Sequence, residues 1–243
     1  MGETVKQHTL RLRLERSAFR LRCEVTDVST IAFDLGFGSH EAFTRAFRRR
    51  FRCSPSDYRT GQSRAHLHSP ADNVGLQESA QQLFISDTQV VQLRATPVAF
   101  RRFVGPYERV SPAAFRELEE WTRRQNIPTE GTIGIAHDAP GITPPENLRF
   151  DVCVRVRCQT PGSATTAFRV FPQRWASSTW YSGPVSRLGE AVAAAYLAST
   201  NLGRFTVEGL PVEEHYTSAA ILTGSRLETL RILLPLTATG PSE

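Results

Sequence analysis

The stretch that most narrowly limits how this chain can fold is residues 28–51, VSTIAFDLGFGSHEAFTRAFRRRF. Apolar residues recur at three- and four-residue steps after Gly36, a residue type whose permissive backbone suits a tight turn between two helices. We expect Ser29 to cap a short first helix and Ser39 to cap a second helix over residues 39–51. A helix, a glycine turn and a helix in this order predict a helix-turn-helix unit.

The second of these helices has an apolar face and a polar face. Phe43, Ala46, Phe47 and Phe51 recur with helical spacing and are expected to face the core. The polar face mixes groups that hydrogen-bond base edges with cations that neutralise phosphate. These candidate DNA-contacting residues are Ser39, His40, Glu41, Thr44, Arg45, Arg48 and Arg49. A solvated surface helix would carry similar charge, so periodicity alone leaves both interpretations open.

The basic surplus of the chain lies wholly in residues 1–68. They hold thirteen Lys and Arg against seven Asp and Glu, whereas the remainder holds sixteen against seventeen. A polyanion is therefore expected to bind the first quarter of the chain. Residues 4–21 contain good helix formers and no Gly or Pro, which predicts one long basic helix. The residues expected near one face of it are Val5, His8, Leu12, Ala18 and Leu21.

Composition predicts two domains joined by a linker. The chain has 243 residues, 40% of them hydrophobic, and no apolar run long enough for a membrane span or a signal peptide, so we expect a cytoplasmic protein. The segment around residues 60–82 is polar and interrupted by Gly and Pro, as is typical of a linker. The predicted organisation is a helix-turn-helix region at 1–60, a linker at 61–87 and a second domain at 88–237.

The second domain contains a loose internal repeat. Two segments each predict a strand, a Gly-Pro pair and a helix, with Gly105-Pro106 and Gly183-Pro184 in matching places. Further strands are predicted after each helix, in TIGIAH and LRFDVCVRVR and in VEEHYT and LETLRILLPL. A strand-helix-strand-strand unit used twice predicts an α+β fold with an antiparallel sheet and helices on one face. The groove between the two halves is a natural ligand site.

The helix-turn-helix segment, VSTIAFDLGFGSHEAFTRAFRRRFRCSPSDYR, resembles the second helix-turn-helix of AraC/XylS-family transcription regulators, including the closing S-P-x-x-Y-R. By this resemblance residues 39–51 form the helix that reads DNA. The resemblance implies base contacts by His40, Glu41, Thr44 and Arg45 and backbone contacts by Arg48 and Arg49. The family usually has glycine where this chain has Arg52, which implies strain or a shifted helix end.

Residues 2–21 resemble the end of the first helix-turn-helix of the same family and the helix that joins its two halves. On this interpretation the chain starts after the first reading helix, so that either the true start lies upstream or the chain is a degenerate regulator. One reading helix with a handful of phosphate contacts is expected to bind DNA weakly and with a steep salt dependence.

The second domain resembles the GyrI-like effector-binding domain in the segments FVGPYERV, GIAHDAPGITPPENLRFDVCV and PVEEHY. In related domains a glutamate of the late strand meets cationic, lipophilic ligands in an aromatic-lined pocket, a role that falls on Glu214 here. Glu213 is the alternative, because adjacent strand residues point to opposite faces and the register could slip by one. The aromatic residues available to line the groove, each equally compatible with a core position, are Tyr107, Trp175, Trp180, Tyr181 and Tyr216.

The sequence thus favours a sequence-specific, ligand-responsive transcription regulator, with double-stranded DNA and a small-molecule effector as partners and RNA polymerase as a further candidate. We expect no catalytic residues, no metal and no cofactor, and no particular oligomeric state. The four cysteines lack zinc spacing and are expected to be buried thiols: Cys23, Cys53, Cys153 and Cys158. The alternative is a stand-alone small-molecule sequestering protein, or a GyrI-like hydrolase with Glu214 as general base.

Overall fold

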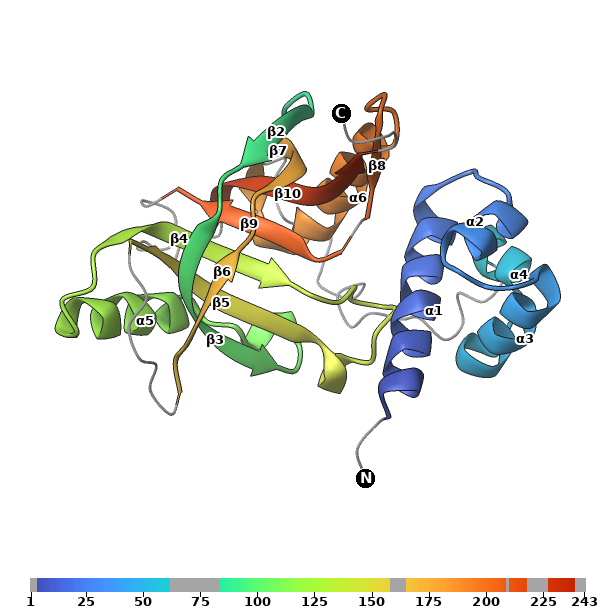
Figure 1. The fold of residues 1–243 in the computed structure, drawn as a ribbon, viewed down its shortest axis with the longest axis horizontal. Helices are drawn as coiled ribbons and strands as arrows, with labels where there is room; N and C mark the ends of the chain where they lie inside the picture. Colours follow the sequence, from blue (N-terminus) through green and yellow to red (C-terminus); the bar gives the residue numbers. More distant parts are fainter. Residues whose placement is uncertain (1–3, 62–83, 158–164, 209, 218–226, 239–243) are drawn as a thin grey trace, which may run out of the picture. The chain divides into compact units, whose positions relative to one another are not determined.

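The computed structural model describes residues 4–61, 84–157, 165–208, 210–217 and 227–238. The chain divides into two units, each with its own core (Figure 1). The first comprises Met1–Val74 together with Ala139–Pro144, and the second comprises Gly75–Asp138 and Pro145–Glu243.

The described part of the first unit is helical, with α1 (Val5–Cys23), α2 (Val28–Asp34), α3 (His40–Phe51) and α4 (Pro55–Thr60). Its core gathers apolar side chains from all four helices: Leu14, Ala18, Leu21, Ile31, Ala32, Phe43, Phe47 and Tyr58. Phe47 meets both Phe43 and Tyr58 edge to face, with ring centroids 5.4 Å apart in each pair. The aromatic spacing along α3 therefore fixes which side of this helix faces inward.

The start of α3 agrees with the sequence, and its end resolves the question raised by Arg52. The Ser39 hydroxyl caps the helix by accepting from the Ala42 amide at 3.1 Å. Arg52 adopts the left-handed conformation, with φ 64°, and donates its amide to the Arg48 carbonyl at 2.8 Å. The helix thus ends at Phe51 as expected, and a non-glycine residue takes a backbone conformation that costs about 1–2 kcal/mol.

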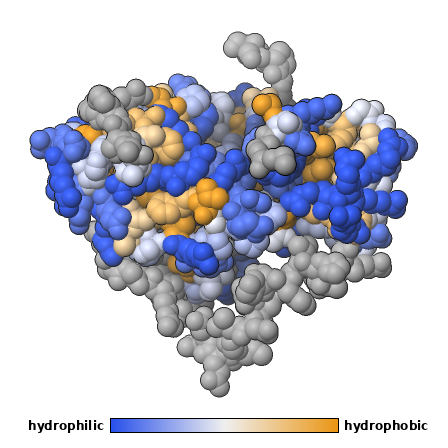
Figure 2. All heavy atoms as spheres, turned by 90° about the horizontal axis from the view of Figure 1, so that it is seen from below, coloured by the Kyte–Doolittle hydropathy of each residue, from blue (hydrophilic) through white to orange (hydrophobic). Residues whose placement is uncertain are grey.

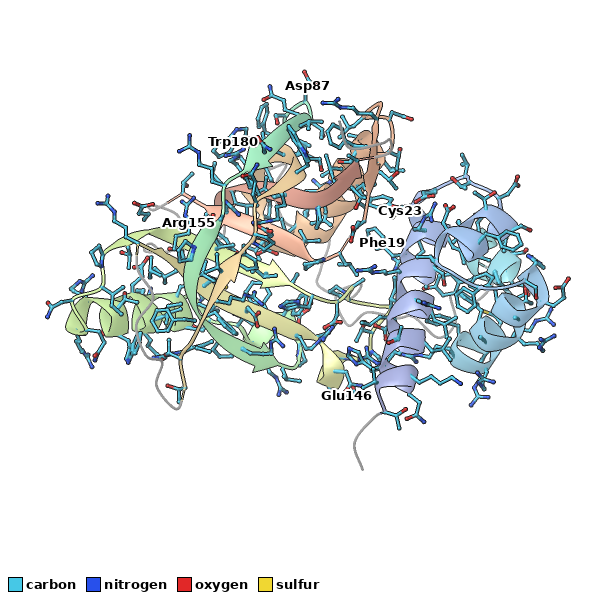
Figure 3. All side chains as sticks on the ribbon, viewed as in Figure 1. Phe19, Cys23, Asp87, Glu146, Arg155 and Trp180 are labelled. Atoms are coloured by element: carbon cyan, nitrogen blue, oxygen red, sulfur yellow. The ribbon has the colours of Figure 1, made fainter. Side chains whose placement is uncertain are left out.

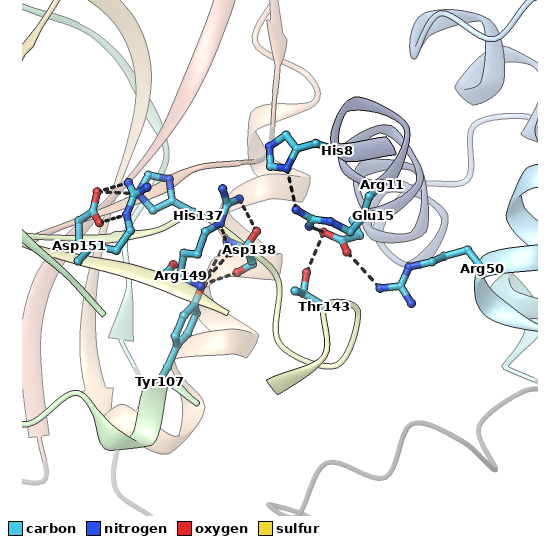
Figure 4. Close-up of polar contacts among 11 residues, drawn as sticks. His8, Arg11, Glu15, Arg50, Tyr107, His137, Asp138, Thr143, Arg149 and Asp151 are labelled. Carbon is cyan, nitrogen blue, oxygen red and sulfur yellow. Dashed lines mark hydrogen bonds and ion pairs between the residues drawn. The ribbon is translucent and has the colours of Figure 1, made fainter. Parts of the chain in front are cut away.

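Two expectations for the first unit are wrong. Helix α2 begins at Val28 with Asp27 in the capping position, so Ser29 lies inside the helix, where its hydroxyl contacts His40 Nδ1 at 3.2 Å. The expected buried face of α1 holds for Ala18 and Leu21 but not at the start of the helix, where Val5 is 84% exposed, and Glu15 is buried although no burial was expected for it. The Glu15 carboxylate is paired with Arg11 at 3.1 Å and with Arg50 of α3 at 3.2 Å (Figure 4), which offsets the cost of burying its charge.

The second unit is built on a ten-stranded sheet in the order β1-β7-β10-β9-β4-β5-β3-β6, with β2 also paired to β7 and β8 to β10 (Figure 1). The strands are β1 (Phe84–Ile85), β2 (Gln89–Leu93), β3 (Thr96–Val104), β4 (Thr129–Ala136), β5 (Arg149–Val156), β6 (Ala167–Phe171), β7 (Arg174–Pro184), β8 (Phe205–Val207), β9 (Val212–Tyr216) and β10 (Leu227–Ala238). The helices are α5 (Pro112–Arg124) and α6 (Leu188–Ser199). The expected α+β fold is confirmed.

The internal repeat predicted from the sequence is visible in the topology. One half is β3-α5-β4-β5 and the other is β7-α6-β9-β10, and the halves join where β4 pairs antiparallel with β9. The predicted linker, 61–87, falls largely on residues outside those described, but its end is wrong, because Phe84 and Ile85 pair with β7 as strand β1. A polar flanking sequence does not prevent a short segment from adding to a sheet edge through its backbone.

Both helices pack on one face of this sheet, which we name the helix-covered face. Trp121 of α5 lies 6.1 Å from Phe168 of β6 between ring centroids, and Ser199 of α6 donates to the Ser177 hydroxyl of β7 at 2.7 Å. Directly paired residues of antiparallel strands share a face, and successive residues alternate between faces. This rule decides the side of the sheet on which every candidate residue lies.

The view in Figure 2 shows a surface that is mostly hydrophilic, with smaller hydrophobic areas between the charged ones. None of the helices in the described part of the chain has the length and apolarity needed to cross a membrane.

Candidate functional site

The polar face of α3 presents the predicted DNA-contacting residues together. His40, Glu41, Arg45, Arg48 and Arg49 are exposed, and Ser39 and Thr44 are half-buried. Phe43, Ala46 and Phe47 are buried on the other side of the helix, while Phe51 is half-buried. The exposed set is therefore available to a duplex, and its contact with DNA remains a prediction.

Local hydrogen bonds set the position or the ionisation of several of these side chains. His40 lies between the hydroxyls of Ser29, at 3.2 Å, and Thr44, at 3.4 Å. Hydrogen bonds from its own backbone amide and from Ser39 lower the pKa of Glu41, so this carboxylate is ionised at the start of the helix. Arg50 is the exception in the arginine run, because its guanidinium is bound to Glu15. Of the three consecutive arginines, Arg48 and Arg49 are exposed cations, and Arg50 forms an ion pair within the fold.

Glu214 lies on the helix-covered face at the join between the two halves of the sheet. Strand β9 pairs it with Gly134 of β4 on one side and with Ile232 of β10 on the other. Its side chain is buried, with the residue 6% exposed, and the Tyr216 hydroxyl donates to Oε2 of its carboxylate. A carboxylate in such a position is stabilised only by hydrogen bonds or by opposite charge.

Several aromatic rings lie near this carboxylate. Phe115 of α5 packs on Tyr216 with ring centroids 5.4 Å apart, and Tyr107 packs on Phe150 at 5.4 Å. Gly134 makes room for them, because a Cβ atom there would lie 2.5 Å from Phe150 Cζ and 3.1 Å from Glu214 Oε2. We name Glu214, Tyr107, Phe115, Phe150 and Tyr216 the Glu214 cluster.

Tyr107 is held at the edge of this cluster by backbone contacts (Figure 4). Its hydroxyl donates to the carbonyls of Asp138, at 2.8 Å, and Arg149, at 3.1 Å, and burial raises its pKa. Asp138 in turn pairs with Arg149 at 2.7 Å. The hydroxyl is therefore neutral and serves to fix the ring, so that Tyr107 offers an aromatic surface.

Of the other three predicted aromatic residues, Trp175 and Tyr181 share the face of Glu214, and Trp180 does not. Trp180 is on the opposite face of the sheet, where Arg231 lies over its ring. Tyr181 is fully buried on the helix-covered face, with its hydroxyl donated to the Pro184 carbonyl. Trp175 packs against Phe205, and its β7 position is four residues, or about 13 Å, from the cross-strand row of Glu214. Phe115 and Phe150 were not predicted as site residues, because their sequence positions are typical of an ordinary core.

Glu213 points away from the Glu214 cluster and is neutralised within the fold. Arg174 binds its two carboxylate oxygens at 2.6 and 2.7 Å, and His215 Nε2 lies 2.9 Å from it. Burial acts to raise the pKa of Glu213, but the hydrogen bond from His215 and the charge of Arg174 outweigh it and lower the pKa. Burial lowers the pKa of His215, so the imidazole is neutral and donates its hydrogen.

A second buried carboxylate, Asp151, lies in the same kind of network. It accepts from His137 at 2.8 Å (Figure 4), and also from Arg102 at 2.7 Å and from Arg169 at 3.0 Å. Burial opposes ionisation, yet these donors hold the pKa of Asp151 well below its usual range. His137 and Asp138 therefore anchor ion pairs of the sheet.

Of the cysteines, Cys153 is buried as expected, whereas Cys23 and Cys53 are half-buried, and Cys158 lies outside the described residues. Burial raises the pKa of Cys23 to about 11, which keeps it a thiol. Within the described ranges no group of three or more His, Cys, Asp and Glu side chains is arranged to hold a metal ion.

Comparison with known proteins accounts for both units. A model of a helix-turn-helix domain matches residues 1–61, and a model of a GyrI-like small molecule binding domain matches residues 86–237. Both resemblances inferred from the sequence are thereby confirmed.

Regulatory protein SoxS of Salmonella typhimurium is 42% identical over 59 residues, and SoxS of Escherichia coli K12 is 41% identical over 59 residues. These matches cover 24% of this chain and 51% of each relative, so the chain spans about half the length of the curated relatives it matches. Among solved structures, a cryo-EM structure of an EcmrR–DNA complex is similar, with a TM-score of 0.51, 16% identity, and coverage of 98% of this chain and 85% of that one. At this identity the likeness shows the fold alone.

Proposed function

The chain belongs to the family with a GyrI-like small-molecule-binding domain, and from this premise we propose that it is a transcription regulator that responds to a lipophilic cation bound at Glu214. In this proposal α3 reads duplex DNA and the Glu214 cluster receives the effector. The effector class and the DNA contacts are the parts that require a test.

The observation that carries the ligand proposal is the surroundings of Glu214. A buried carboxyl group in the Glu214 cluster combines, in its ionised form, a negative charge with ring faces. Both attract organic cations, the charge directly and the rings through their quadrupoles, and removal from water strengthens the attraction. A lipophilic cation would also bury its own apolar surface here, whereas an anion would meet the carboxylate at close range.

The DNA proposal is supported by the match to a helix-turn-helix domain and by the exposed arc of α3. Arg45 and Glu41 lie on the arc near the first turns, where a reading helix approaches base edges, and Arg48 and Arg49 follow toward its end. RNA polymerase is proposed as a further partner, since a regulator acts on transcription through it.

The ligand proposal is tested by titrating a cationic rhodamine dye into the full chain and measuring fluorescence polarisation. Glu214→Gln keeps the shape and removes the charge, so it should weaken the dye about ten- to a hundred-fold, as expected for loss of one charge-assisted contact. Glu213→Gln changes the neighbouring carboxylate on the other face, and Glu190→Gln changes an exposed one on α6. Both should leave dye affinity within about two-fold.

Equal dye affinity in the wild type and in Glu214→Gln, or a larger loss in folded Glu213→Gln, would remove Glu214 from the site. The hydrolase alternative is checked on the same samples by mass spectrometry of an ester dye after incubation. Conversion of the ester that Glu214→Gln abolishes would favour an enzyme, whereas unchanged dye supports a binding domain.

A further inference from the structure

The face of the sheet opposite the helices carries a row of residues that the Glu214 cluster does not use. Trp180 of β7, Arg231 of β10 and His215 of β9 are directly paired across three neighbouring strands. Paired residues share a face, so all three side chains lie on the side of Glu213. The exposed fraction of Trp180 is 42%, which leaves much of its ring accessible.

Arg155 of β5 belongs to the same face. Ile133 pairs with His215 on one side and with Cys153 on the other, and Arg155 is two residues beyond Cys153 in an alternating strand. Figure 3 labels Arg155 and Trp180 on the strands that carry them. We name Arg155, His215, Arg231 and Trp180 the arginine row.

The two guanidinium groups of this row have no carboxylate within ion-pairing distance among the described residues. Arg231 donates to the Ser178 hydroxyl at 3.1 and 2.8 Å and lies 5.5 Å from the Trp180 ring centroid. Arg155 Nη2 donates to the Glu130 carbonyl at 2.9 Å, and its buried Nε has no hydrogen-bond partner. Half-buried cations with only neutral partners create a positive potential in front of them.

Two buried carboxylates lie on this face, Glu213 and Asp151, and other side chains already bind both of them. Arg174 Nη2 donates to both carboxylate oxygens of Glu213, and His215 also donates to this carboxylate. The negative charge of Glu213 is therefore largely balanced before it can pair with Arg155 or Arg231. The pKa of His215 reflects this positive potential. Burial is the main cause that lowers it, and the charges of Arg155 and Arg231 lower it further. The single N–H of the neutral imidazole is donated to Glu213, so the donors that this face offers to a ligand are those of the two arginines.

We propose that the arginine row binds the acidic group of a small planar anion, a phosphate or a carboxylate, while the planar body stacks on Trp180. Guanidinium groups match the oxygens of both acids with paired hydrogen bonds, and an exposed indole offers an aromatic face beside them. This second ligand site lies across the sheet from Glu214 and takes the opposite charge.

The proposal is tested by isothermal titration calorimetry of the full chain with 1-naphthyl phosphate and 1-naphthoate, which share one planar body and differ in the acid. We expect at least one of them to bind, and the neutral 1-naphthalenemethanol to bind at least about ten-fold more weakly. Binding of one acid alone identifies the phosphate or the carboxylate as the recognised group. Arg231→Met and Arg155→Met keep an apolar stem and should each weaken the anion about ten-fold or more.

Two controls separate this site from general charge and from the proposed effector site. Arg124→Met removes an exposed arginine of α5, on the helix-covered side, and should change anion affinity less than about two-fold. Glu214→Gln should leave anion affinity unchanged, so failure of the cation proposal does not affect this test.

Lack of binding of both acids at about 1 mM, or an equal loss from Arg124→Met, would overturn the arginine row as a site. Circular dichroism checks that each variant is folded. If Arg231→Met does not fold, Arg155→Met decides the matter, because its guanidinium contributes no side-chain pair to the fold.

Discussion

Glu213 and Glu214 are neighbours in sequence and almost equally buried, at 5% and 6% exposure, yet they meet different chemistry. Glu213 faces Arg174 and His215, which neutralise it within the sheet. Glu214 accepts from the Tyr216 hydroxyl, in a cluster where the Phe115 ring packs against those of Tyr216 and Phe150. The alternation of a β-strand thus divides two identical side chains between a structural ion pair and a candidate ligand contact.

The first unit repeats this division on a helix. Arg49 and Arg50 are adjacent on α3, but Arg50 pairs with the buried Glu15, whereas Arg49 is exposed beside the other candidate DNA contacts. Arg50 and Glu213 are each held in an ion pair by a residue of another element. Arg49 is exposed, and Glu214 lies in a cluster with aromatic rings.

The largest effect is expected from breaking the ion pair of Glu213. Arg174→Met leaves a buried carboxylate with His215 alone, which should lower the free energy of unfolding by about 3–5 kcal/mol, the usual cost of an uncompensated buried charge. Urea unfolding followed by fluorescence measures it. The double variant with Glu213→Gln should recover part of the loss, and a loss below about 1 kcal/mol in the single variant would show that Glu213 is not held as described.

A smaller loss is expected on the other face from Gly134→Ala. The new Cβ would come 2.5 Å from Phe150 Cζ, so rings of the Glu214 cluster must move. We expect about 1–3 kcal/mol of destabilisation and weaker rhodamine binding. Gly189→Ala, at a glycine of α6 whose added Cβ meets nothing within 4 Å and whose φ is not positive, controls for the Gly-to-Ala change itself. If Gly134→Ala bound dye as tightly as the wild type, the rings around Glu214 would not form the binding surface.

The pair on α3 should separate stability from DNA binding. Arg50→Ala removes one of the cations bound to buried Glu15 and should lower the free energy of unfolding by about 1–2 kcal/mol. Arg49→Ala should leave stability within about 0.5 kcal/mol but weaken all duplexes alike and reduce the salt slope by about one ion. Thermal unfolding and DNA titration at several salt concentrations measure both. If Arg49→Ala lowered stability and Arg50→Ala lowered only DNA affinity, the described positions of these two arginines would be contradicted.

The most modest effect is a decline of stability in mild acid. His215 has a lowered pKa in the fold, so below its ordinary value of 6.5 the unfolded chain takes up a proton that the folded chain does not. Glu213 also has a lowered pKa, and its contribution, full above 4.5, is lost as the pH falls through the folded value. Unfolding free energies should therefore fall from about pH 6.5 downward. His215→Gln should flatten the upper part of this decline, and an unchanged profile would argue against a buried neutral imidazole.

Local patterns predicted the elements but not the partners of charged residues. The spacing of Phe43 and Phe47 and the Ser39 cap were enough for α3, because periodicity and capping are local properties. The burial of Glu15 was missed, since it depends on Arg50, thirty-five residues away. Strand alternation placed Glu213 and Glu214 on opposite faces, but only the packing of α5 and α6 decides which face holds the aromatic rings. The same alternation along β7 and β10 places Trp180 on the face opposite to Glu214.

The central claim, that an effector bound at Glu214 controls DNA binding, is tested most directly by measuring DNA affinity with and without saturating rhodamine at fixed salt. The duplex is selected by the protein itself from a random pool. The proposal predicts that the dye changes the DNA Kd of the wild type by at least about five-fold, and that the same dye concentration has no such effect on Glu214→Gln. An unchanged Kd in the wild type, or an equal change in Glu214→Gln, would contradict it.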